Sequence, residues 1–215
     1  MLESFAAFAV FAAVLTITPG LDTVLVLRTT AVSGRRAGFV AILGILLGCL
    51  MWAVVSALGV TAVLAASDLA FTALRIAGAA YLGYLGLMAL WRARRLQPVE
   101  PPPADTAPLP AAAAMTPAAA FRAGLLANLL NPKIGVFYLS AMPQFLPAGV
   151  NALAGSLALA AIHVVEGAIW LSLVVLAVNR ARRWLTRPTV RRRLDQLTGV
   201  AFLAFGLRLA FTRPA

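Results

Sequence analysis

Apolar residues occur along the chain in six long runs, which short polar or basic segments separate. The runs cover Phe5–Leu27, Phe39–Leu64, Leu69–Trp91, Gly124–Leu146, Ala152–Val178 and Leu197–Phe211. A helix needs about 20 apolar residues to cross the hydrocarbon core of a bilayer. The residues do not alternate between apolar and polar as they do in the strands of a membrane barrel. The pattern predicts an all-α, polytopic integral membrane protein with six transmembrane helices.

Composition supports a membrane protein over a soluble one. Hydrophobic residues make up 62% of the 215 residues, and the mean hydropathy is +0.92, whereas soluble domains contain about 45–50% apolar residues. The single cysteine, Cys49, excludes an intrachain disulfide and is predicted to be a packing residue. The segment Met1-Leu2-Glu3-Ser4 has no basic residue. We therefore expect the first apolar run to be kept as a span and not cleaved as a signal peptide.

The basic residues predict an orientation in the membrane. The net charge is +11, from 18 Lys and Arg against 7 Asp and Glu. The arginines fall in alternate loops, namely Arg28, Arg35 and Arg36, then Arg92, Arg94, Arg95 and Arg122, then Arg180, Arg182, Arg183, Arg187, Arg191, Arg192 and Arg193. Cytoplasmic loops carry the excess of Lys and Arg. Both termini are therefore predicted to be periplasmic, and the arginines need no nucleic-acid partner to explain them.

A Pro- and Ala-rich segment divides the chain into two halves. Residues 97–117 form the predicted cytoplasmic linker, residues 1–96 the first three-helix half and residues 118–215 the second. Because each half has an odd number of spans, any repeat between them must be inverted in the membrane. The predicted architecture is therefore a 3+3 inverted repeat, which is common among transporters.

Proline interrupts the first and the fourth runs. The first contains Thr18-Pro19-Gly20-Leu21-Asp22 and the fourth contains Asn131-Pro132-Lys133. In both, a capping residue precedes a proline, which removes an amide donor and favours the first position of a new helix. We therefore expect Thr18 and Asn131 to cap helices that restart inside the bilayer. The alternative is that each proline only kinks a continuous helix.

The two restarted helices are expected to point in opposite directions and to begin near the same depth. Their N-terminal ends, with free amides and partial positive charge, can then face one site. The predicted substrate-binding residues are Thr18, Pro19, Gly20, Asp22, Asn131, Pro132 and Lys133. The alternative for the two charges, which are costly inside a bilayer, is a buried ion pair between Asp22 and Lys133 that holds the halves together.

The fifth run contains two titratable residues, His163 and Glu166. Their spacing places them on one side of a helix, so together with Asp22 they are candidates for proton coupling. The alternative is a structural hydrogen bond in the interior. We predict no metal site and no cofactor, because no partner motif has ligand spacing. Gly44 and Gly48 form a Gly-x-x-x-Gly pattern, which predicts close helix packing within the subunit.

Several of these segments resemble the LysE/RhtB family of amino-acid exporters. They are Thr18-Pro19-Gly20-Leu21-Asp22, Gly34-Arg35-Arg36-Ala37-Gly38, residues 77–86, Asn128-Leu129-Leu130-Asn131-Pro132-Lys133 and Met142-Pro143-Gln144-Phe145. The resemblance covers nearly the whole chain except the linker. It departs from the family's frequent Pro-Gly-Pro pattern at Leu21. It implies export of amino acids across a bacterial inner membrane, driven by the proton motive force, by six spans that often form a homodimer.

The combined hypothesis is that the half-helix N-termini and Lys133 hold the carboxylate of an amino acid, while Asp22 holds its ammonium group or exchanges a proton for it. The alternatives are export of another small solute or a cation, a passive channel, and an intramembrane enzyme. The enzyme would need a nucleophile and a base, which His163 and Glu166 alone do not supply.

Overall fold

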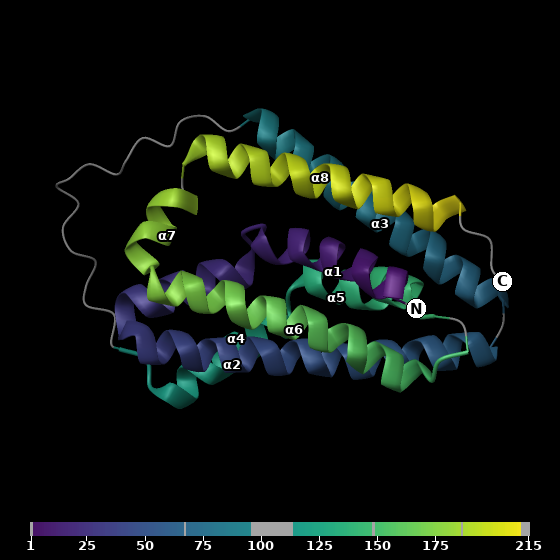
Figure 1. The fold of residues 1–215 in the computed structure, drawn as a ribbon, viewed down its shortest axis with the longest axis horizontal. Helices are drawn as coiled ribbons and strands as arrows, with labels where there is room; N and C mark the ends of the chain where they lie inside the picture. Colours follow the sequence, from purple (N-terminus) through teal and green to yellow (C-terminus); the bar gives the residue numbers. More distant parts are fainter. Residues whose placement is uncertain (1, 67, 96–113, 148, 186, 212–215) are drawn as a thin grey trace.

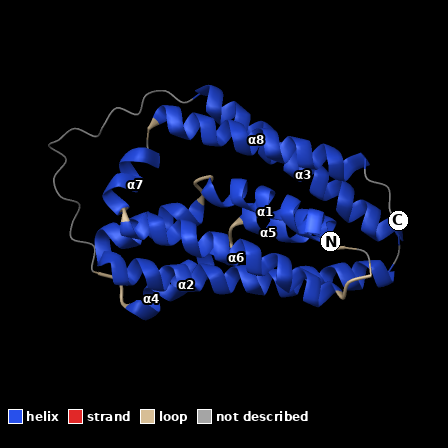
Figure 2. Cartoon of the chain, viewed as in Figure 1, coloured by secondary structure: helices blue, strands red, loops and turns tan. Residues whose placement is uncertain are grey.

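The computed structural model describes residues 2–66, 68–95, 114–147, 149–185 and 187–211, and every regular element in these ranges is helical (Figures 1 and 2). The helices are α1 (Leu2–Ile17), α2 (Leu21–Ala66), α3 (Asp68–Arg95), α4 (Pro117–Leu129), α5 (Pro132–Val136), η1 (Phe137–Ala141), η2 (Met142–Phe145), α6 (Ala152–Leu176), α7 (Val178–Leu185) and α8 (Pro188–Phe211). Most of the predicted linker, residues 97–113, lies outside the described residues.

Helix α2 reverses direction at Gly34. This residue has φ 83° and ψ 171°, which is not a helical conformation and which glycine adopts most readily. A Cβ atom on Gly38 would meet the side chain of Thr30, although eight residues of straight helix would separate the two by about 12 Å. The part of α2 before Gly34 therefore continues the first predicted span, and the part after it forms the second. The expected loop at residues 28–38 is mostly helical.

The short helices α1 and α5 lie in the middle of the bundle (Figure 1). Helix α2 packs against α4 and α6 on one side, and α3 packs along α8 on the other. Elements of residues 1–96 thus lie mainly against elements of residues 118–215. This interlocked arrangement places the two interrupted helices next to each other.

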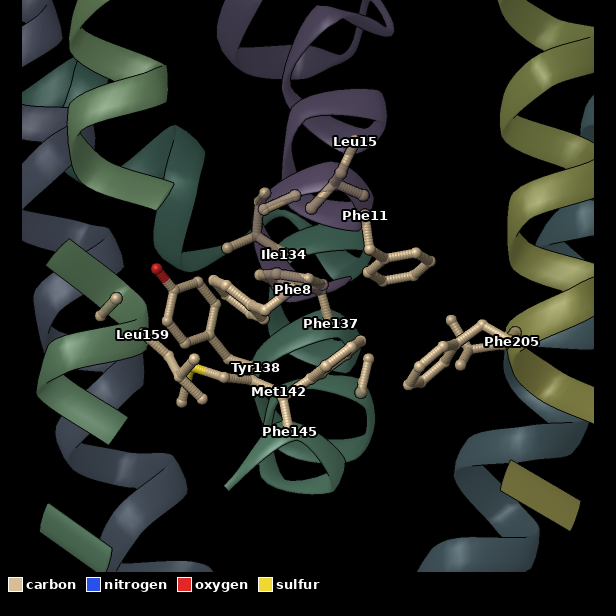
Figure 3. Close-up of a cluster of buried hydrophobic side chains, with 14 of the residues drawn as sticks. Phe8, Phe11, Leu15, Ile134, Phe137, Tyr138, Met142, Phe145, Leu159 and Phe205 are labelled. Carbon is tan, nitrogen blue, oxygen red and sulfur yellow. The ribbon is translucent and has the colours of Figure 1, made fainter. Parts of the chain in front are cut away.

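An aromatic cluster fixes α1 against the η1–η2 segment and α8. The rings of Phe8 and Phe137 stack with centroids 5.6 Å apart, and those of Phe145 and Phe205 stack at 5.0 Å. Phe11 lies among them, 4.6 Å from Phe205 (Figure 3). Rings in these offset arrangements add attraction beyond the burial of their surface. The cluster therefore packs α1, which precedes the first interruption, against the η1–η2 segment, which follows the second.

Glycines bring the main chains of α2 and α4 into contact. A Cβ atom on Gly44 would meet the carbonyl oxygen of Phe121, and a Cβ atom on Gly124 would meet that of Ala41. Gly48 lies against the side chain of Asn128, and its added Cβ would be 2.6 Å from Asn128 Oδ1. The Gly44–Gly48 pattern is therefore used within the chain, as predicted, and it lets two helices approach without side chains between them.

The outer surface is apolar and several interior groups are polar. Side chains such as Leu58, Leu130, Val200 and Leu207 are at least 60% exposed. Further large apolar side chains are exposed on α2, α3, α6 and α8, as is expected of helices that face lipid and not water. By length and hydropathy alone, two helices among the described residues, Leu21–Gly59 and Ala152–Leu176, are long and apolar enough to cross a membrane. This criterion therefore does not establish the six predicted spans.

The basic segments gather at one end of the bundle. The reversal in α2, the C-terminal end of α3, the start of α4, helix α7 and the start of α8 all lie at that end (Figure 1). Arg35 there donates a hydrogen bond of 2.9 Å from Nη2 to the carbonyl of Leu176, at the C-terminal end of α6. A cation at that end of a helix donates to a carbonyl that has no partner within the helix and interacts favourably with the partial negative charge there.

Two boundaries of the predicted spans differ from the structure. The last helix begins at Pro188, not Leu197, and the predicted basic loop before it contains α7. Helix α4, which contains the start of the fourth predicted run, begins at Pro117 and not at Gly124, and the side chain of its N-cap Thr116 accepts from the amide of Ala119. The hydropathy pattern missed these helix ends because both helices begin before their long apolar run, in segments that contain arginine or polar residues.

The α2–α4 contact gives a stability prediction. We expect Gly44→Ala to lower the free energy of unfolding by about 1–3 kcal/mol, because the methyl group would meet backbone atoms that cannot move aside. Thermal unfolding of the purified protein in detergent measures the change. Gly59→Ala, in the same helix but with nothing within 4 Å of the added Cβ, is the matched control. Equal midpoints for both variants would contradict the close contact.

Candidate functional site

The first interruption separates α1 from α2 at residues 18–20. Thr18 Oγ1 donates to the carbonyl of Val14 at 2.7 Å and also contacts the hydroxyl of Thr198 on α8. Helix α2 begins at Leu21, and the amide of Val24 donates to the carbonyl of Gly20 at 3.0 Å. The expectation that Thr18 caps the new helix is therefore wrong. Its hydroxyl turns back to α1, and the helix restarts after Pro19.

The second interruption follows the predicted pattern. Asn131 precedes α5 and its side-chain oxygen accepts from the amide of Lys133 at 3.1 Å, with Pro132 at the first helical position. The carbonyl of Asn131 accepts from the amides of Ile134 and Gly135. Asn131 is thus an N-cap that satisfies a free amide of a restarted helix. Its side chain is buried, with 4% exposed.

Lys133 joins the two interruptions. Its Nζ donates to the carbonyl of Leu15 at 2.9 Å and to that of Thr18 at 3.1 Å. These carbonyls lie at the C-terminal end of α1, where the helix has partial negative charge and its last carbonyls have no N–H donors within the helix. Lys133 therefore caps α1 instead of pairing directly with Asp22, and its side chain lies about 3.8 Å from a Cβ built on Gly20.

Asp22 lies in the first turn of α2, beside the interruption. Its Oδ2 accepts a hydrogen bond of 3.0 Å from Asn128 Nδ2, and the same amide lies 3.5 Å from the sulfur of Cys49. Asp22 Oδ1 is buried and has no partner among the residues that the structure describes. Sequence reasoning did not select Asn128 as a site residue, although an Asn three residues before the cap Asn131 was a signal.

One cavity connects the two interruptions. Residues on four segments line it, and among them are Thr16, Thr18, Gly20, Asp22, Thr23, Cys49, Asn131, Lys133, His163 and Trp170. Its volume is about 50 Å³, which at roughly 10–15 Å³ for each water is space for only a few waters. An amino acid therefore requires the cavity to widen. The structure brings together the predicted residues Thr18, Gly20, Asp22, Asn131 and Lys133.

His163 and Glu166 are not paired with each other. His163 Nδ1 and the hydroxyl of Tyr138 are 2.9 Å apart, and His163 lines the cavity. Glu166 does not line it, and its Oε2 is buried without a partner in the described ranges. Sequence reasoning missed Tyr138 because its run of apolar neighbours gave it no distinguishing pattern.

The segment after the second interruption is not a regular α-helix. Residues Phe137–Ala141 form a π-helix and Met142–Phe145 a 3₁₀-helix. Ser56 Oγ donates to the carbonyl of Tyr138 at 2.6 Å, and Ser140 Oγ donates to that of Val136 at the same distance. Single-turn π-helices occur frequently at functional sites. Here the π-helix carries the tyrosine that contacts His163.

Comparison with known proteins identifies relatives over nearly the full length. The family model described as LysE type translocator matches residues 13–213. The membrane protein YrhP of Bacillus subtilis is 30% identical over 207 residues, with 96% of this chain and 98% of YrhP covered. The threonine efflux protein of Escherichia coli K12 is 27% identical over 215 residues, with 99% and 100% covered.

A third relative is the homoserine/homoserine lactone efflux protein of Salmonella typhimurium. It is 28% identical over 213 residues, with 99% of this chain and 98% of that protein covered. No solved structure matches the chain. The residues that line the cavity therefore lie within the region that the family model matches.

The role of Lys133 as a cap gives the second prediction. Lys133→Met removes two hydrogen bonds to buried carbonyls, and a bond to a charged group contributes about 1.5–3 kcal/mol. We expect a clear drop in the thermal unfolding midpoint in detergent. Arg122→Met, which removes an exposed cation from α4, should leave the midpoint nearly unchanged. A Lys133→Met protein as stable as the Arg122→Met protein would contradict the cap.

Proposed function

Because the chain belongs to the LysE type translocator family, a family of membrane transporters and not of enzymes, we propose that it exports amino acids or close analogues across a bacterial inner membrane. The observation that carries the proposal is the cavity between the two interrupted helices. It contains a carboxylate and lies beside the N-terminal ends of α2 and α5. Two relatives are named efflux proteins for threonine and for homoserine and its lactone.

The proposed substrate position follows from the charges of an amino acid. The free oxygen of Asp22 would accept the ammonium group, because it is buried and has no protein partner in the described part of the chain. The amides at the start of α2 would hold the carboxylate, as helix N-termini bind anions, because those of Lys133, Ile134 and Gly135 at the start of α5 are already bonded to Asn131. Lys133 uses two of its three donors on carbonyls, so its remaining donor can contribute one further hydrogen bond to the substrate.

The proposed topology has six spans in a 3+3 inverted repeat. In this scheme the spans are α1 with the first part of α2, the rest of α2, α3, then α4 through η2, α6 and α8. An axis that exchanges the halves pairs the second span with the fifth and the third with the sixth. The packing of α2 on α6 and of α3 on α8 supports this pairing.

The proposed orientation places both termini in the periplasm. The gathering of the basic segments at the end of the bundle opposite the start of α1 supports it, since Lys and Arg are enriched on the cytoplasmic side (Figure 1). In this proposal two copies of the chain form a homodimer. Export would follow from alternating exposure of the cavity to the two sides, coupled to the proton motive force.

An exporter of another small solute on the same scaffold is the second candidate. The carboxylate of Asp22 in the cavity could also bind an amine or another cation. It therefore favours a cationic solute over an anionic one as the alternative substrate. A passive channel would not need a cavity enclosed by two capped interruptions. Transport against a concentration gradient separates the exporter from the channel.

The third prediction tests the substrate and Asp22 together. Proteoliposomes loaded with a mixture of amino acids that includes threonine and homoserine should lose some of them faster under an imposed pH gradient. Asp22→Asn keeps the side-chain volume and removes the charge, so we expect gradient-driven export to fall to the background level. Glu3→Gln, at an exposed acid in the first turn of α1, is the control. Full activity of Asp22→Asn would mean that this residue is a polar contact and not an ion or proton carrier.

The fourth prediction concerns proton coupling through His163 and Glu166. If both residues carry protons, Glu166→Gln should change the pH dependence of export and His163→Ala should change it less. If both are structural, each variant should lower the amount of folded protein and leave the pH profile of the remainder as in the wild type. The hydrogen bond to Tyr138 favours a structural role for His163. Export per folded molecule across a pH series decides, and an unaltered Glu166→Gln profile would end the relay hypothesis.

A further inference from the structure

Two hollows adjoin at the junction of α6 and α7, away from the central cavity. One has a volume of about 300 Å³ and is lined by Arg180, Arg183, Trp184 and Arg187. The other has a volume of about 220 Å³. Its lining consists of Trp170, Leu173, Val174, Ala177, Arg180, Ala181 and Trp184. Arg180 and Trp184 line both hollows, so a basic cavity continues directly into an apolar groove.

We propose that this pair of hollows binds one anionic phospholipid, with its phosphate against Arg180, Arg183 and Arg187 and an acyl chain in the groove along Leu173 and Ala177. An occupant must be anionic at one end and apolar at the other, which excludes an inorganic anion and a peptide of uniform polarity. Guanidinium groups match phosphate oxygens in geometry and charge. Basic pockets beside transmembrane helices on the cytoplasmic side bind anionic lipid headgroups.

The groove lies where an acyl chain of the bilayer would be. It occupies the last turns of α6, and Leu173 and Leu176 there are 55% and 52% exposed, as lipid-facing side chains are. Helix α7 follows at once and stands at the basic end of the bundle (Figure 1). Trp184 is 42% exposed between the two hollows, and tryptophan is enriched at the headgroup level of membranes. The basic cavity is therefore at headgroup depth and the groove below it.

The headgroup preference follows from the charges around the basic cavity. Three arginines line it, and none of the other described residues that line it is acidic. A zwitterionic headgroup would bring its own cation toward these arginines, whereas phosphatidylglycerol adds only negative charge. The site also touches the transport machinery, because Trp170 lines both the groove and the central cavity. The lipid site rests on the membrane placement in the proposed function, but it does not require that amino acids are the substrate.

Lipid retention by the purified full-length chain tests this site. The protein is solubilised in a mild detergent, and binding of phosphatidylglycerol and of phosphatidylcholine is measured by native mass spectrometry. The triple variant Arg180→Gln, Arg183→Gln, Arg187→Gln should bind phosphatidylglycerol about tenfold or more weakly, since each arginine near an anionic lipid contributes several-fold. The matched control is Arg191→Gln, Arg192→Gln, Arg193→Gln, which removes the same charge from exposed positions at the start of α8. It should retain wild-type affinity.

A second pair of variants tests the groove with all arginines intact. Ala177→Phe fills the groove and should weaken phosphatidylglycerol binding, whereas Ala161→Phe, at an exposed position earlier on α6, should not. Millimolar inorganic phosphate should not displace the lipid. Equal losses in the two arginine triples, equal affinity for the two lipids, or displacement by phosphate would overturn the site. These results do not depend on transport, so they are separate from a failure of the proposed function.

Discussion

Two interrupted helices leave main-chain carbonyl and amide groups in the middle of an apolar bundle, and these groups must find partners within the protein. The structure satisfies this constraint with a single side chain from one interruption reaching the other. The Nζ of Lys133 binds the carbonyls of Leu15 and Thr18 at the end of α1. At the start of α5, Asn131 accepts the amide of Lys133 itself. The end of α1 therefore depends on a side chain from the second half, whereas the start of α5 is capped within its own half.

The site takes its polarity from this arrangement. Because the lysine is committed to α1, Asp22 keeps a carboxylate oxygen without a partner among the described residues. Asn128 orients the other oxygen, and the close approach of α2 and α4 at Gly48 brings Asn128 to it. The glycine contacts and the aromatic cluster around Phe11 are thus what hold the polar groups at one cavity. Polar residues gather inside while large apolar side chains such as Leu58 and Leu207 cover the outside.

Local patterns in the sequence predicted the local features of this structure. The helical class followed from the apolar runs, and the second interruption followed from Asn131 and Pro132, because a cap bonds to an amide two residues away. The cap expected of Thr18 failed because its hydroxyl had two local choices and bonded to Val14 in the preceding turn. The reversal at Gly34 was hidden because its neighbours on both sides are helical.

Hydrogen bonds between residues that are far apart in the chain could not be predicted from the sequence. Lys133 reaches a carbonyl 118 residues away, and Asn128 reaches Asp22 across 106 residues. No pattern of spacing encodes these pairs, because they depend on how α1 and α5 meet in the bundle. The partner of His163 is Tyr138, 25 residues earlier, and it is placed by a π-helix that no residue type marks. The three-residue spacing of His163 and Glu166 therefore did not predict that they would fail to form a hydrogen bond with each other.

The native cysteine offers the most direct measurement of whether the cavity between the interruptions is the transport site. Cys49 lines this cavity and is the only cysteine in the chain. The rate at which N-ethylmaleimide alkylates it can be followed by mass spectrometry in proteoliposomes, with and without the amino acids that the protein exports. The account predicts that an exported amino acid slows alkylation and that Asp22→Asn removes this protection. Alkylation that no exported amino acid slows, or a cysteine that never reacts during transport, would contradict a substrate site at the two interrupted helices.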